Sequence, residues 1–141
     1  MRADSQPYPI VYCVLLRSWL VERRFLNNAE LNVMSGDIPE NDWREFKRIY
    51  TKLLNLYCER SLIELEKTTS SGEGSPHERY LRAYKLMMQR DKKIGEMFND
   101  YRRSTAQFQL SLMRKNGLLL DADVEVFSEE TQRIIRMLDP V

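Results

Sequence analysis

Between residues 80 and 112 the chain carries a row of positions spaced by alternating steps of four and three. Eight of the ten positions are apolar or aromatic, and the two exceptions are Asp91 and Thr105. Such steps return side chains to one face of a helix with 3.6 residues per turn, so the row predicts one long amphipathic helix. The row, called the seam below, comprises Tyr80, Tyr84, Met87, Asp91, Ile94, Phe98, Tyr101, Thr105, Phe108 and Leu112.

Both ends of this helix carry their own sequence signals. In Ser75-Pro76-His77-Glu78 the serine can cap the third helical N–H, the proline suits the first helical position, and the glutamate can reach back to the cap. At the other end Asn116-Gly117 favours a left-handed C-terminal cap. The sequence therefore predicts one helix over 76–116, about 40 residues and ~60 Å long at 1.5 Å per residue.

Hydrophobic periodicity, together with the residues typical of helix ends and turns, predicts three further helices and one linker. A helix over 9–27 starts at a proline and is apolar all round in its first half, where β-branched residues keep a strand as the alternative. A second helix over 39–67 has acids in its first turn and a broad apolar stripe. The polar, glycine-containing stretch 68–74 reads as a flexible linker, and a short helix is expected over 129–138.

These elements predict an all-α fold. A chain of 141 residues fits a single domain, and we expect 1–141 to form one bundle of about four helices built on the long amphipathic helix 75–116. A helix of that length projects beyond a compact domain of this size. Either the helices 9–27 and 39–67 lie end to end along it, or a second copy covers part of the seam. The second arrangement predicts a homodimer.

Charge changes this picture only locally. The chain has 22 Lys and Arg against 21 Asp and Glu, but residues 77–116 hold ten bases and four acids. This basic helix either packs beside acidic segments of its own fold or offers a surface to an acidic partner. The candidate contacts for such a partner are Arg79, Arg82, Arg90, Lys92, Lys93, Arg102 and Arg103.

Asp91 interrupts the apolar seam, and two interpretations stay open. In the first, the seam drifts around the helix because 3.6 does not match 3.5, and the carboxylate reaches solvent or Lys92. In the second, a buried polar group on the seam sets the register or the choice of partner, as single polar residues do in coiled coils.

Residues for catalysis or metal binding are hard to assemble from this sequence. The single histidine, His77, falls in a predicted capping turn. Glu96 and Asp100 stand four residues apart, where Lys93 and Arg103 would form ion pairs with them. The acids of 121–125 resemble half of a calcium loop, but valine and glutamine occupy the demanding positions 126 and 132. We expect no catalytic residues, no metal site and no cofactor.

Cys13 and Cys58 lie 45 residues apart in apolar stretches. Free buried thiols in a reducing compartment are the expected state, and one bridge between the first two helices stays open. The apolar run that begins at Ile10 is broken by Arg17, which makes it too short for a bilayer span of ~20 residues. It also lacks the cleavage site of a signal peptide. A cytoplasmic location follows by default, with no membrane partner.

The function that these patterns favour is a non-enzymatic helical module for protein interaction or self-association. Its expected partner is a second copy or another helical protein, and no small-molecule substrate is inferred. The candidate self-association surface is the seam without Thr105. The alternative is a helical nucleic-acid-binding or regulatory domain that uses the basic flank of the long helix.

Overall fold

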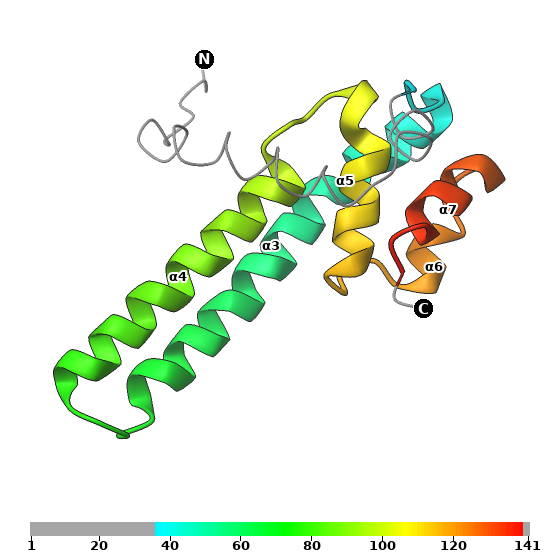
Figure 1. Ribbon diagram of the computed structural model, residues 1–141. Coiled ribbons are helices and arrows are strands. Elements are labelled where there is room, and N and C mark those ends of the chain that lie inside the picture. The colour runs from blue at the N-terminus through cyan, green and yellow to red at the C-terminus, as the bar shows by residue number, and fades with distance from the viewer. Residues whose placement is uncertain (1–35, 140–141) are drawn as a thin grey trace, which may run out of the picture.

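The structure, a computed structural model, describes residues 36–139. Over this range the chain is all-α, as predicted, and the helix expected over 9–27 lies outside the described residues. Two long helices run side by side as a hairpin, and three shorter helices gather beside one end of it (Figure 1). The helices are α3 (Glu40–Ser70), α4 (Pro76–Phe98), α5 (Arg103–Lys115), α6 (Asp121–Val124) and α7 (Glu129–Arg136).

The prediction of one continuous helix over 76–116 is wrong, because α4 ends at Phe98 and α5 begins at Arg103. A continuous helix would direct the N–H of Arg102 to the carbonyl of Phe98. Instead this N–H donates to the carbonyl of Asp100 over 2.9 Å, and Arg102 has an extended backbone with φ −138° and ψ 153°. The hydroxyl of Thr105 also donates to the Asp100 carbonyl, over 2.7 Å, and this bond helps to hold the connection between α4 and α5 in its non-helical conformation.

An aromatic cluster explains why the chain leaves the helix at this point. The ring of Tyr101 lies with its centroid 4.7 Å from that of Tyr50 and 5.3 Å from that of Trp43, both on α3. The Tyr50 hydroxyl donates to the Phe98 carbonyl and so replaces the helical donor. Aromatic contacts with residues about 50 positions away thus stabilise a break for which the periodicity alone contains no signal.

The first helix of the hairpin matches the prediction closely. It was expected over 39–67 and runs over Glu40–Ser70, with Pro39 at its N-cap. The last turn extends into the expected linker, and its hydroxyl groups donate to carbonyls of the preceding turn: Thr68 to Glu64 over 2.9 Å and Ser70 to Glu66 over 2.7 Å. The connection to α4 is correspondingly short.

The C-terminal helix begins as predicted and ends near the expected position. Ser128 is the N-cap of α7, and its hydroxyl oxygen accepts from the N–H of Thr131. The segment between α5 and α7 contains the single-turn helix α6. Its apolar residues lie in the core: Leu118, Leu119, Val124 and Phe127 are buried.

The hydrophobic core lies where the first half of α3 meets α5, α6, α7 and the end of α4. Its fully buried side chains include Phe46, Met97, Leu110, Met113 and Ile135. The rest of the hairpin, residues 62–95, contains no fully buried residue and projects away from this core (Figure 1). This projecting segment is called the arm below.

Candidate interaction face on the arm

The structure divides the seam between the core and the arm. On the arm, Tyr80, Tyr84 and Met87 are 66%, 57% and 44% exposed. Phe98 and Leu112 are buried in the core. Ile94 and Phe108 are half-buried and pack against the core, whereas Tyr101 keeps an exposed edge despite its stacking. The seam residues therefore do not form one surface, and the consecutive exposed apolar members of the seam lie on the arm.

A different row of α4 residues packs against α3. The side chains of Ala83, Leu86 and Arg90 recur at helical spacing and are half-buried, and Arg90 binds Glu64 of α3 with its Nε 2.9 Å from Oε2. Around the axis of α4, this inner row lies roughly a third of a turn away from Tyr84. The contact with α3 therefore leaves the seam side of α4 uncovered by α3.

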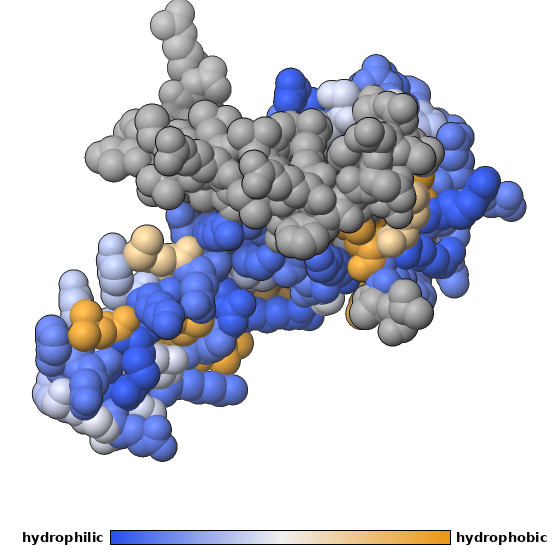
Figure 2. Space-filling view, in the orientation of Figure 1, coloured by the Kyte–Doolittle hydropathy of each residue, from blue (hydrophilic) through white to orange (hydrophobic). Residues whose placement is uncertain are grey.

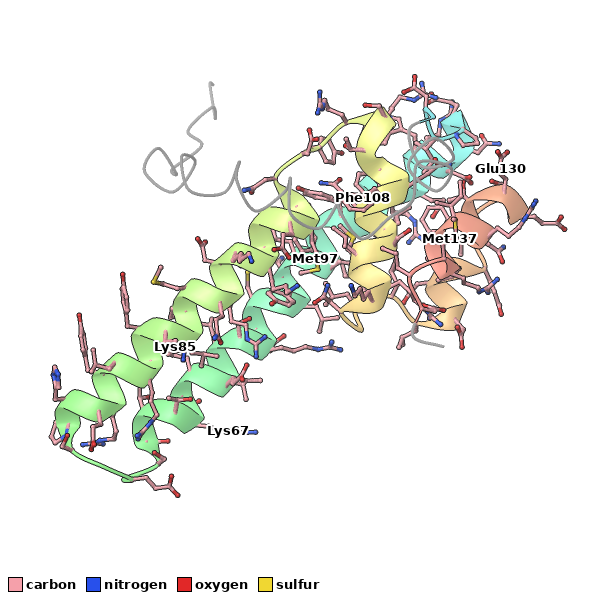
Figure 3. The ribbon with its side chains drawn as sticks, in the orientation of Figure 1. Lys67, Lys85, Met97, Phe108, Glu130 and Met137 are labelled. Carbon is pink, nitrogen blue, oxygen red and sulfur yellow. The ribbon has the colours of Figure 1, made fainter. Side chains whose placement is uncertain are left out.

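The uncovered side of α4 carries five large apolar residues. Tyr80, Leu81, Tyr84, Met87 and Met88 are each between 44% and 66% exposed. Figure 2 shows hydrophobic patches among hydrophilic residues on the arm, and Figure 3 shows side chains that stand out from α4 on the side away from α3. The sequence prediction missed Leu81 and Met88, although their spacing of seven is a helical signal that could have found them.

The polar residues His77 and Asp91 lie at the two ends of this stripe, and both are exposed. Within residues 36–139 neither has a hydrogen-bond or salt-bridge partner, so Asp91 reaches solvent without pairing with Lys92. The outer face of α4 is defined here as His77, Tyr80, Leu81, Tyr84, Met87, Met88 and Asp91.

A capping box fixes the start of the outer face, as predicted. The Ser75 hydroxyl oxygen accepts from the N–H of Glu78 over 3.2 Å, and a Glu78 carboxylate oxygen accepts from the N–H of Ser75 over 2.7 Å. The hydrogen bonds from the backbone and side chain of Ser75 lower the pKa of the Glu78 carboxyl, because they stabilise its charged form. The first turn of α4 is thereby held in helical geometry.

The three candidate basic contacts nearest the tip of the arm have acceptors within the chain. Arg79 donates to the carbonyl of Thr69 over 3.1 Å. Arg82 donates to the carbonyl of Glu73 in the hairpin connection. As noted, Arg90 binds Glu64. These three side chains therefore join α4 to α3 and to the hairpin connection.

The four candidates nearer the core have acceptors too. The Nζ atoms of Lys92 and Lys93 lie 3.7 Å and 3.0 Å from carboxylate oxygens of Glu96, which is buried, so the predicted ion pair between Lys93 and Glu96 is present. Asp100 pairs with Arg102 over 2.5 Å rather than with Arg103, and its hydrogen bonds raise the Arg102 pKa. The remaining candidate, Arg103, binds Glu40 over 3.0 Å and the carbonyl of Ile38 over 3.0 Å.

Cys58 is free and half-buried, whereas Cys13 lies outside the described residues. Among residues 36–139 no group of three or more His, Cys, Asp or Glu side chains is arranged to hold a metal ion. In the same part of the chain, no helix combines the length and apolar character needed to cross a bilayer.

The fold and this face together define an all-α protein with a projecting two-helix arm that carries an exposed apolar stripe. Comparison with protein-family models, curated proteins and solved structures finds no significant match. The functional proposal therefore rests on the chemistry of the arm.

Proposed function

We propose that this chain is a non-enzymatic helical interaction module that self-associates through the outer face of α4. The observation that carries the proposal is the group of five large apolar side chains, each at least 44% exposed, on one side of an arm that has no core of its own. Contiguous apolar patches on soluble proteins mark interaction sites far more often than single exposed apolar residues do.

The composition of the face suits a helical partner. Two tyrosines supply large contact areas with few rotatable bonds, and two methionines supply flexible side chains that adapt to the surface opposite them. Burial of this apolar surface would contribute about 25 cal/mol for each Å² removed from water. A helix is the matching occupant, because residues spaced by three and four form a straight stripe along α4.

The half-buried free thiol of Cys58 supports a reducing, cytoplasmic setting for this module. The alternative function, nucleic-acid binding through the basic flank, has weaker support. Seven of the ten basic residues of the flank, the candidates for an acidic partner, already bind an acceptor in their own chain, so phosphate contacts there would have to replace existing hydrogen bonds or ion pairs.

The test is the mass of the full chain in solution, measured by light scattering across a wide concentration range at low and high salt. We expect a dimer that persists at high salt, because the contact is mainly apolar. Tyr84→Glu places a charge in the middle of the face and should give a monomer. Gln89→Glu adds the same charge at an exposed position of α4 outside the outer face and should leave the dimer intact.

Two results would overturn the proposal. One is a wild-type chain that stays monomeric at the highest concentration. The other is a Tyr84→Glu variant with the same mass as wild type. Circular dichroism of both variants establishes that a change in mass does not come from unfolding.

A further inference from the structure

We infer that two copies pair through α4 in antiparallel orientation, about a two-fold axis at Tyr84. This inference rests on the proposed function and adds the partner surface and its register. The outer face has a heptad spacing: His77, Tyr84 and Asp91 are seven residues apart, as are Tyr80 and Met87, and Leu81 and Met88. Tyr84 therefore lies at the centre of the stripe.

Antiparallel pairing about Tyr84 makes the apolar residues complementary. A two-fold axis at this position brings residues that precede Tyr84 in one copy to the level of residues that follow it in the other. Tyr80 and Leu81 of one copy then lie beside Met87 and Met88 of its partner. Each methionine thioether meets an aromatic or aliphatic side chain, a favourable and adaptable contact.

Charge also selects this orientation. His77 lies in the first turn of α4, where the helix dipole is positive, and Asp91 lies four turns further on. In the antiparallel pair each Asp91 carboxylate reaches the N-terminal end of the partner helix, beside His77. In a parallel pair the two Asp91 carboxylates would lie side by side and repel each other. Both residues are exposed and have no partner within residues 36–139, so they are free for this contact.

The arm leaves room for such a partner. The inner row of α4, represented by Ala83, Leu86 and Arg90, packs against α3 and lies roughly a third of a turn from the outer face. A second copy therefore approaches α4 from a side that α3 does not occupy. Two arms joined in this way form a four-helix arrangement with the two α4 helices in its centre.

Disulfide trapping tests the register directly. Tyr84→Cys places a thiol at the two-fold axis, close to the same thiol of the second copy. This variant should form a disulfide-linked dimer readily in a redox buffer. Met88→Cys alone should not, because the two copies of position 88 lie about 12 Å apart along the helix at 1.5 Å per residue. Met88→Cys mixed with Tyr80→Cys should form the linked heterodimer. Gln89→Cys is the control for background from the native cysteines Cys13 and Cys58, and mass spectrometry of the linked peptides locates each bond.

A charge exchange tests the contact between His77 and Asp91. Asp91→Lys should weaken the dimer on the order of tenfold, because the symmetry introduces the unfavourable pair twice. His77→Asp should weaken it similarly by placing two carboxylates together. The double variant His77→Asp with Asp91→Lys should restore the dissociation constant to within about threefold of wild type.

The outcomes separate this inference from the proposed function. If light scattering shows a dimer but Met88→Cys links as readily as Tyr84→Cys, the helices are parallel and the inference fails. If a dimer forms and Tyr84→Cys links no better than Gln89→Cys, another surface or partner segment is involved, and the register fails although self-association stands. If wild type is a monomer, both proposals fail.

Discussion

Asp42, in the first turn of α3, accepts two hydrogen bonds from Ser128, the N-cap of α7. The Ser128 N–H lies 2.9 Å from Oδ1, and its hydroxyl lies 2.5 Å from Oδ2. The carboxylate belongs to a residue that is only 3% exposed, and 86 positions separate the two residues in the sequence. The Asp42 carboxylate thus connects the first helix of the described residues to the last through the backbone and the side chain of Ser128.

Removal of this carboxylate should destabilise the fold. Asp42→Ala leaves two donors of Ser128 without their acceptor and opens space in a buried site, so we expect a loss of about 2 kcal/mol in the free energy of unfolding. Urea denaturation followed by circular dichroism measures the loss. Asn41→Ala, at the exposed neighbouring position, is the control and should change stability by less than ~0.5 kcal/mol. Equal stabilities of the two variants would show that the pair is not structurally important.

The break between α4 and α5 depends on the ring of Tyr101. Tyr101→Ala removes the stacking on Trp43 and Tyr50 and should cost about 2 kcal/mol, less than a fully buried aromatic because one edge of the ring is exposed. Tyr101→Phe keeps the ring and serves as the matched control, with stability close to wild type. Thermal unfolding of wild type and the two variants measures the effect. Equal melting temperatures of the alanine and phenylalanine variants would contradict this role of the ring.

Gln109 on α5 is a site where a substitution should stabilise the protein. The residue is 2% exposed, and within residues 36–139 neither its amide oxygen nor its amide nitrogen has a hydrogen-bond partner. Because an unpaired buried amide is costly, Gln109→Leu should raise the free energy of unfolding by about 1–2 kcal/mol. Thr51→Leu, at an exposed position of α3, should have little effect in the same urea titration. A destabilised Gln109→Leu variant would mean that the amide has a polar partner in solution.

The capping box gives the start of α4 a pH dependence of known sign. Hydrogen bonds from Ser75 lower the pKa of Glu78 in the folded state. The stabilisation is therefore complete above the unfolded pKa of ~4.3 and is lost as the pH falls through the lower folded pKa. An NMR titration of the Glu78 carboxyl carbon should have its midpoint below the ordinary glutamate value. Ser75→Ala removes the hydroxyl and keeps the backbone N–H, so it should raise this midpoint only in part, and an unchanged midpoint would exclude the Ser75 hydroxyl as a cause.

Local sequence signals located several elements well. The capping box at Ser75 and the cap at Ser128 both start helices where they were predicted, because each involves only residues within one turn of each other. Pro39 likewise marks the start of α3. The end of α3 was less accurate, since composition alone assigned to a linker a polar stretch that forms the last turn of the helix.

The prediction of the candidate face was partial for a related reason. Periodicity identified Tyr80, Tyr84 and Met87 as one stripe, but it could not tell which stripe of α4 would meet α3. Arg90 and Ala83 belong to the packed side, although an arginine is not an obvious packing residue. The ion pair of Arg90 with Glu64 across the hairpin shows that this side of α4 faces α3.

The sequence by itself determined that this chain is helical, where most of its helices begin, and that α4 carries an amphipathic stripe, because caps and helical spacing act over a few residues. Only the tertiary structure decided that the long helix breaks after Phe98, since the break depends on contacts of Tyr50 and Tyr101 made across distant segments. It also decided that Phe98 and Leu112 of the seam are buried in the core while Tyr80, Tyr84 and Met87 stay exposed on the arm. Burial is a property of the whole packing arrangement, which the spacing of residues along one helix does not contain.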